Sequence, residues 1–303
     1  MPRPKPELVL VGVTILWAST FVITKDALHD VAPLPFLTVR FGGAALVMLL
    51  VYWRRFPAPA KLMRDGIILG LMNASGLLLQ VFGQASTTAS KSAFITSLNT
   101  PLTPLIGLLL YRTRPTRPQL AAVAIASVGL ALLTWPGTGA RWNVGDLLTV
   151  GCAILYALTI VQIARRSPGH HIGALTAVQV ASAALFFGAL FLASRALISS
   201  VPAQSIGRLP ALLQLEARPF VLSTRAIGEM AYMALVCTVV TFTAQTWAMS
   251  KMSATHAAIV FALEPVFATA MALGWGGSSE WPGTRGASGA GLVMLAVVVS
   301  EIL

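Results

Sequence analysis

The chain has 303 residues, of which 56% are hydrophobic and only 10% are charged, and its formal net charge is +11. A soluble domain carries about 25% charged residues, so this composition excludes an ordinary soluble protein and favours lipid as the solvent. The basic residues lie in short stretches between apolar runs, which is typical of membrane topology signals and argues against nucleic-acid binding. Both cysteines, Cys152 and Cys237, lie inside apolar runs, so no disulfide framework is indicated.

Ten apolar segments follow one another along the chain. A helix needs about 20 mostly apolar residues to cross a bilayer, whereas a barrel strand needs about ten alternating ones. The predicted spans are residues 8–28, 34–53, 66–84, 91–111, 118–136, 145–164, 172–195, 227–248, 254–275 and 286–303. The sequence therefore predicts an all-α polytopic membrane protein of about ten transmembrane helices. In the long connection 196–226 we expect a short interfacial helix.

The distribution of Lys and Arg predicts the orientation. With the N-terminus inside, twelve basic residues fall in the cytoplasmic stretches, and five, Arg40 among them, fall in the short stretches of the opposite side. Basic residues are retained on the cytoplasmic side, so both termini are predicted to be cytoplasmic. The expected location is a bacterial-type inner (plasma) membrane, crossed many times.

The chain also repeats itself. Residues 12–22 and 151–161 share six of eleven positions, and Trp17 is replaced by Tyr156 at the equivalent place. A weaker match aligns helix four with helix nine and pairs Pro101 with Pro265. The repeating unit is then five helices, which makes the second unit inverted, as in alternating-access transporters. We predict two repeats, residues 1–139 and 140–303; chance similarity between apolar helices is the alternative.

Several predicted helices carry one polar stripe at helical spacing, as a shared aqueous cavity requires. The threonines on these stripes favour bonding to their own helix backbone. Amides need partners that a helix does not supply, so the amides are expected to face the cavity, whereas Leu77 beside them is expected to face lipid. The predicted substrate-pathway residues are Trp17, Asn73, Gln80, Asn99, Tyr156, Gln245 and Glu264.

Glu264 is the acidic residue predicted near the middle of a span, where an ionisable group suggests function. It is expected to bind a substrate ammonium or to take up a proton; a purely structural role is the alternative. Pro101 and Pro265 interrupt helices four and nine and are predicted hinges, with static shaping of the bundle as the alternative. No Lys or Arg is expected deep in the cavity.

The order of these motifs resembles the drug/metabolite transporter superfamily, in its EamA-like branch. The resemblance rests on residues 16–21 (Leu-Trp-Ala-Ser-Thr-Phe), Pro35 with Arg40, Pro101, and residues 263–265 (Leu-Glu-Pro). Within that branch the chain looks most similar to the YddG-type exporters of aromatic and other amino acids. The resemblance implies that helices five and ten are peripheral and that the other eight surround a central cavity.

These observations together predict a membrane exporter of amino acids, aromatic and other neutral types, or of related small metabolites, working by alternating access. A carrier of drug cations or of another metabolite is the alternative from the same superfamily, and an intramembrane enzyme is a further one. An enzyme is not favoured, because the adjacent pair His170 and His171 lies in a predicted loop without a helical partner. The expected partners are the amino-acid substrate and the lipid bilayer. No cofactor, metal or nucleic acid is expected, and the oligomeric state is left open.

Overall fold

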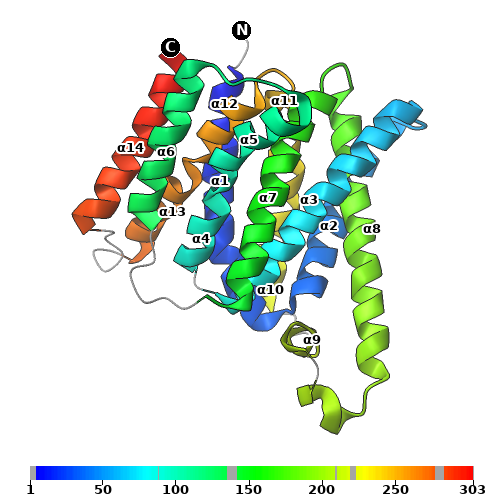
Figure 1. The fold of residues 1–303 in the computed structure, drawn as a ribbon. Helices are drawn as coiled ribbons and strands as arrows, with labels where there is room; N and C mark the ends of the chain where they lie inside the picture. Colours follow the sequence, from blue (N-terminus) through cyan, green and yellow to red (C-terminus); the bar gives the residue numbers. More distant parts are fainter. Residues whose placement is uncertain are drawn as a thin grey trace.

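The protein is described by a computed structural model, which covers residues 5–87, 89–134, 142–208, 210–218, 223–276 and 283–302. Every regular element in these residues is a helix (Figure 1). The α-helices are α1 (Pro6–Asp30), α2 (Pro33–Tyr52), α3 (Ala60–Ser86), α4 (Ala89–Ser97), α5 (Asn99–Tyr111), α6 (Arg117–Thr134), α7 (Val144–Arg166), α8 (Ile172–Ser199), α9 (Ala211–Glu216), α10 (Thr224–Ala234), α11 (Thr241–Met249), α12 (Ala254–Phe261), α13 (Glu264–Gly276) and α14 (Gly283–Ile302). Short 3₁₀ helices cover Trp53–Arg55 and Ala203–Arg208, and a π-helix covers Leu235–Val240.

Ten helical segments in the described part of the chain are long and apolar enough to cross a membrane, which confirms the predicted fold class. Most boundaries agree with the prediction to within a few residues; the largest differences are in the third span, which begins at Ala60 instead of residue 66, and in the seventh, which ends at Ser199 instead of residue 195. The predicted short helix in the long connection is α9. Figure 1 shows both chain ends at one end of the bundle, which we call the terminal end, and α9 at the opposite end, the far end.

The fourth and ninth spans are both broken near their middle, at the places predicted from proline. α4 ends at Ser97 and α5 begins at Asn99, two residues before Pro101. α12 ends at Phe261, and α13 begins with Glu264 and Pro265. Proline lacks the N–H that the helix would use and clashes with the carbonyl four residues earlier, so each break follows from the sequence. Whether the breaks move as hinges stays a prediction.

The fifth and tenth spans pack against each other at one side of the bundle (Figure 1). Gly129 of α6 and Gly289 of α14 lie at the contact, where a Cβ atom on Gly129 would approach the Gly289 carbonyl oxygen to 2.7 Å. Small residues at such crossings allow two backbones to come close, which favours helix association in lipid. This pair lies outside the ring of helices that lines the main cavity described below.

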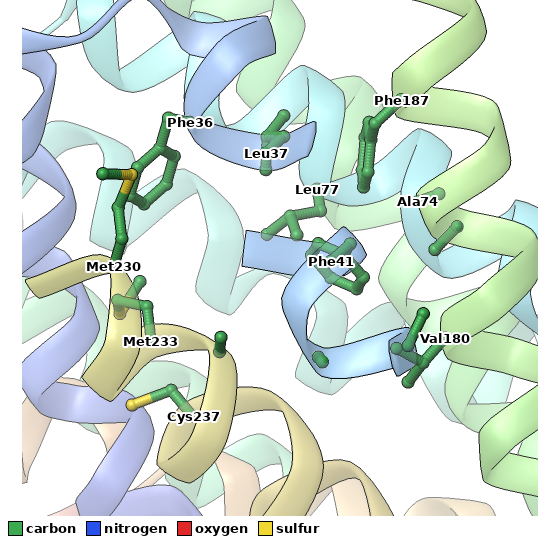
Figure 2. Close-up of a cluster of buried hydrophobic side chains, with 14 of the residues drawn as sticks. Phe36, Leu37, Phe41, Ala74, Leu77, Val180, Phe187, Met230, Met233 and Cys237 are labelled. Carbon is green, nitrogen blue, oxygen red and sulfur yellow. The ribbon is translucent and has the colours of Figure 1, made fainter. Parts of the chain in front are cut away.

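A large apolar cluster joins α2, α3, α8 and α10. Figure 2 shows Phe41 of α2 and Phe187 of α8 close together, and their ring centroids are 5.1 Å apart. Met233 of α10 joins the same cluster, as does Leu77 of α3, which is only 8% exposed. The prediction that Leu77 faces lipid was therefore wrong. A leucine that packs against other helices and one that faces lipid look the same in sequence, because both surroundings are apolar.

The predicted orientation is testable with reporter fusions. A reporter attached after residue 303 is expected to read as cytoplasmic, and one inserted between α6 and α7, within residues 136–145, is expected to read as external. The physical reason is the retention of basic residues on the cytoplasmic side. The reverse pair of readings would invert the orientation while leaving the ten spans intact.

Candidate functional site

A cavity lies inside the bundle, between α1, α2, α3, α5, α7, α11 and the break between α12 and α13. Its water-accessible volume is about 80 Å³. One water needs about 10–15 Å³ on this measure, so the cavity has room for about six waters, or about 180 Å³ of liquid. The structure brings all seven predicted substrate-pathway residues together on its wall: Trp17, Asn73, Gln80, Asn99, Tyr156, Gln245 and Glu264.

The resemblance implied that eight spans surround the cavity, and for the seventh span this was wrong. Among the described residues, α8 contributes none to the wall. It packs instead behind α2 and α3, where a Cβ atom on Gly70 would come within 2.3 Å of the Gln179 carbonyl oxygen. The two backbones approach so closely that α8 supports the wall from outside.

Trp17 of α1 lies at the centre of an aromatic wall. Its ring stacks on Phe261 at 5.6 Å and meets Phe242 edge-on at 6.0 Å between centroids. Its indole Nε1–H donates to Thr241 Oγ1 at 2.9 Å, which fixes the ring plane. One side of the cavity is thus a rigid apolar surface able to take up an aliphatic or aromatic side chain.

Tyr156 of α7, which matches Trp17 in the other half of the sequence, lies on the cavity wall with α3. Its hydroxyl donates to Gln80 Oε1 at 2.8 Å. Gly76 makes room for the ring, because a Cβ atom there would lie 2.8 Å from two ring carbons of Tyr156. No described residue accepts from the amide nitrogen of Gln80, so this nitrogen can donate to a ligand.

The threonines and amides behave differently, as the side-chain chemistry predicted. The hydroxyls of Thr20 and Thr159 donate to carbonyls of their own helices at 2.7 Å. Asn73 and Gln245 line the cavity, and their amides make no hydrogen bond to another described residue. Asn99, at the start of α5, accepts a 3.3 Å bond from Thr100. The amides therefore supply the neutral donors and acceptors of the cavity.

Glu264 reaches the cavity from the break in the ninth span. It is the first residue of α13, so the helix N-terminus lies beside its carboxylate, a position that favours a negative charge. Among the described residues no side chain forms a hydrogen bond or ion pair with this carboxylate, so its oxygens are open to a ligand or a proton.

Arg40 is the residue that sequence reasoning missed. It was counted with the outer basic residues, but it is the eighth residue of α2, is only 4% exposed and lines the cavity. The expectation that no Lys or Arg lies deep in the cavity was therefore wrong. Its guanidinium donates from Nε to Thr238 Oγ1 at 3.0 Å and from Nη2 to the Cys237 carbonyl at 3.2 Å. No described residue accepts from Nη1.

The π-helix explains how the eighth span holds this arginine. Thr238 and Cys237 lie in Leu235–Val240, where the wider turn exposes backbone carbonyls to side-chain donors. The Thr238 hydroxyl also donates to the Met233 carbonyl five residues earlier, at 2.8 Å. A buried guanidinium needs such acceptors, since an unsatisfied charge is strongly unfavourable inside a bundle. No signal in the sequence marks a π-turn.

The cavity extends toward the far end and is packed shut at the terminal end. Its wall reaches Thr24 and Gln84, which lie in the last turns of α1 and α3. Toward the terminal end, buried side chains fill the space instead: Leu10, Leu62, Leu69, Ile160, Ile163, Leu175, Met249 and Val260.

A polar network closes the same end. Arg166 Nη1 lies 2.6 Å from Asp65 Oδ1, and His170 Nε2 lies 3.0 Å from Asp65 Oδ2. Arg166 also donates to Gln162, which in turn donates to the Tyr111 hydroxyl. The expectation that the histidine pair lacks a helical partner was wrong for His170, which is held against α3. The network ties α3, α5 and α7 together where the cavity ends.

Cysteine labelling tests whether the amide side chains face water. In a background without Cys152 and Cys237, single cysteines at Asn73 and Gln245 are expected to react with small water-soluble thiol reagents, because both line the cavity. Leu71→Cys is the matched control on α3, since Leu71 is 39% exposed on the outer surface of the bundle, toward lipid. Equal reaction at Leu71 and Asn73 would contradict a separate aqueous cavity.

Comparison with known proteins agrees with this architecture. The sequence profile of the EamA-like transporter family matches residues 5–135 and again 143–301. Two proteins of Archaeoglobus fulgidus, each described as an uncharacterized transporter, share 29% identity over 265 residues and 24% over 272 residues. The first alignment covers 86% of this chain and 75% of the relative, and the second covers 87% and 86%. A solved crystal structure at 14% identity covers 98% of this chain and 96% of its own, with a TM-score of 0.73, a likeness of fold.

Proposed function

Because this chain belongs to the EamA-like transporter family, we propose that it carries neutral amino acids, including aromatic ones, and exports them across the inner membrane by alternating access. The observation that supports this substrate class is that Arg40 and Glu264 both line the same small cavity. One buried guanidinium and one buried carboxyl group offer a partner for each end of a zwitterion.

Each end of an amino acid has a matching group. The free Nη1 edge of Arg40 suits the substrate carboxylate, since guanidinium and carboxylate form charge-assisted hydrogen bonds. The unpaired carboxylate of Glu264 suits the ammonium. The free amides of Asn73 and Gln245 complete the polar side, and the wall of Trp17 and its neighbouring phenylalanines suits the substrate side chain.

The size of the cavity supports the same class. About 180 Å³ of liquid volume is the scale of one small or medium amino acid, with an aromatic side chain extending toward the far end, and it is too small for a nucleotide sugar. A drug cation would meet the positive guanidinium of Arg40 in the same space, which is unfavourable at close range. The amino-acid proposal therefore fits the cavity better than the other carriers of the superfamily.

Alternating access rests on the two halves. The family profile matches twice, over stretches close to the proposed repeats 1–139 and 140–303, and the fourth and ninth spans break at corresponding places. Inverted halves exchange two conformations around a central site. In the conformation described here the cavity extends toward the far end, which is the external end if both termini are cytoplasmic.

Counterflow in proteoliposomes tests the proposal directly. Vesicles loaded with an unlabelled neutral amino acid are expected to accumulate the labelled form, whereas labelled drug cations and sugars are expected not to exchange. Exchange needs no energy source, so the result is independent of proton coupling. Accumulation of a cation without accumulation of any amino acid would overturn the substrate class and leave the family assignment standing.

A further inference from the structure

A second cavity, which we call the far-end pocket, lies between the start of α2, the last turns of α8 and the end of α9. Its volume is about 490 Å³, and it shares no lining residue with the central cavity. Thr38 comes from α2, Phe191 and Arg195 come from α8, and Glu216 and Arg218 come from α9 and the residues after it. In Figure 1, α9 lies at the far end of the bundle, beside the beginning of α2.

The inner part of the far-end pocket contains a carboxylate, that of Glu216, with a hydrogen-bond partner for only one of its two oxygens among the described residues. Glu216 is only 2% exposed, and its Oε1 accepts a 2.9 Å hydrogen bond from the backbone N–H of Leu34, in the first turn of α2. Its Oε2 is buried and has no hydrogen-bond partner among the described residues, and the same is true of the hydroxyl of Thr38. A buried carboxylate oxygen without a donor is unfavourable, so this corner of the pocket suits a donor group such as an ammonium.

The outer part of the pocket is basic. Arg195 and Arg218 are exposed on its rim, and no described carboxylate forms an ion pair with either of them. Two guanidinium groups on the wall of one pocket suit a phosphate, which accepts paired N–H bonds from arginine. The pocket therefore presents, from inside to outside, one acceptor for a cation and two donors for a phosphate.

The far-end pocket borders the apolar surface of the bundle, where lipid chains would lie. Phe191 and Val39 form apolar wall, and the exposed apolar surface of the bundle continues from them through Leu192, which is 68% exposed. Arg195 lies four residues before the end of α8, where a membrane span meets the headgroup region. Basic residues close to the membrane surface attract the anionic phosphates of lipid headgroups.

We propose that the far-end pocket binds the headgroup of an aminophospholipid, with its ammonium at Glu216 and its phosphate between Arg195 and Arg218. A phosphate attached by a short link to a primary ammonium is the chemistry that satisfies both parts of the pocket. A purely anionic headgroup would bring its charge toward the buried carboxylate, so the pocket discriminates against it. This site is independent of the proposed transport activity.

The proposal includes a dependence on pH. Burial raises the pKa of Glu216 to about 7, even though the N–H of Leu34 and the charge of Arg195 lower it. The charged groups that line the pocket around Glu216 are Arg195 from α8 and Arg218 after α9, whereas the residues that α2 contributes, Pro35, Thr38 and Val39, are all neutral. Arginine keeps its charge throughout, so Glu216 alone titrates. Binding of the ammonium is expected to be strongest at about pH 8 and above, where Glu216 is charged, and to weaken as the pH falls through about 7 and Glu216 is protonated.

Lipid-dependent thermal stability tests the site on the full-length protein. The protein is placed in nanodiscs of phosphatidylcholine that contain increasing fractions of phosphatidylethanolamine or of phosphatidylglycerol. Phosphatidylethanolamine is expected to stabilise the wild type at about ten-fold lower content, since its ammonium adds a charge-assisted hydrogen bond to Glu216 that phosphatidylglycerol cannot make. Glu216→Gln, which keeps the bond from Leu34, is expected to lose this preference. Arg195→Gln weakens binding of both lipids, and Arg54→Gln, an exposed arginine at the terminal end, is the control.

Each outcome decides the proposal. Equal stabilisation by the two lipids in the wild type would overturn it, and so would an unchanged preference in Glu216→Gln. Water-soluble phosphoethanolamine, added alone, distinguishes a lipid headgroup from a free ligand. Protection as strong as that given by the lipid would show that the pocket binds a soluble ligand and would overturn the proposal of a lipid site. A preference present at pH 8 and reduced at pH 6, absent in Glu216→Gln, would support the site as described.

Discussion

Replacing Glu264 by Gln is expected to reduce counterflow of neutral amino acids by about ten-fold or more. The substitution keeps the shape of the side chain and removes the charge that meets the substrate ammonium, a contact worth about 1.5–3 kcal/mol. The loss should be smaller for an analogue without the ammonium, such as indole-3-propionate compared with tryptophan. The measurement is the initial rate of exchange per folded protein, for both ligands, in wild type and Glu264→Gln.

The control is Glu7→Gln, which removes an acid in the first turn of α1, away from the cavity. Three results separate the roles of Glu264. Weakened counterflow indicates contact with the ammonium, and intact counterflow with a lost response to an imposed pH gradient indicates proton coupling. If both properties are unchanged in a well-folded Glu264→Gln protein, neither functional role holds and recognition rests on Arg40 and the amides.

Replacing Arg40 by Met is expected to have the larger effect, a loss of about 100-fold in exchange of amino acids. The side chain lies within the bundle and lines the cavity; Thr238 and the Cys237 carbonyl accept from Nε and Nη2 of its guanidinium, and no described residue accepts from Nη1. A buried charged hydrogen bond of about 3 kcal/mol corresponds to this factor. Arg40→Lys keeps the charge but not the planar fork, so it should recover only part of the rate.

A comparison of ligands distinguishes binding from folding at Arg40. Tryptophan amide lacks the carboxylate, so its exchange should fall much less than that of tryptophan in Arg40→Met. Arg54→Met, at the terminal end, serves as the matched arginine control, and thermal melting confirms that each variant is folded. An equal loss for both ligands would make Arg40 a structural residue and would remove the main support for a zwitterionic substrate.

Three features could be predicted from the sequence: the number of spans, the breaks in two of them and the polar wall of the cavity. Long apolar runs predict spans, because lipid leaves few other structures for them. Pro101 and Pro265 predict breaks, because proline removes a backbone donor. Asn73, Gln80 and Gln245 predict a common cavity, because amides are unfavourable in lipid; the structure places all three on one wall, and their role in transport remains to be tested.

The residues that the sequence analysis misplaced depend on side-chain reach and on contacts between distant parts of the chain. The long side chain of Arg40 carries its charge away from its Cα position, so a count by loops assigned it to the outside. The contact of His170 with Asp65 joins residues 105 positions apart, and no local pattern marks it. The positions of Arg40 and His170 therefore depend on contacts across the bundle, which sequence spacing does not predict.

The π-helix allows the eighth span to contain one more residue than a regular α-helix with the same faces would. Met233 and Gln245 are twelve positions apart, which would rotate them by about 120° from each other on a regular α-helix. The widened turn absorbs one residue, so the two side chains differ by only about 20°, and both face inward. Deleting one residue within positions 235–240 would leave a regular helix with both faces still aligned, and it would take away the acceptors that hold Arg40. We therefore expect the extra residue to serve the binding of the buried Arg40 guanidinium and not the packing of the span.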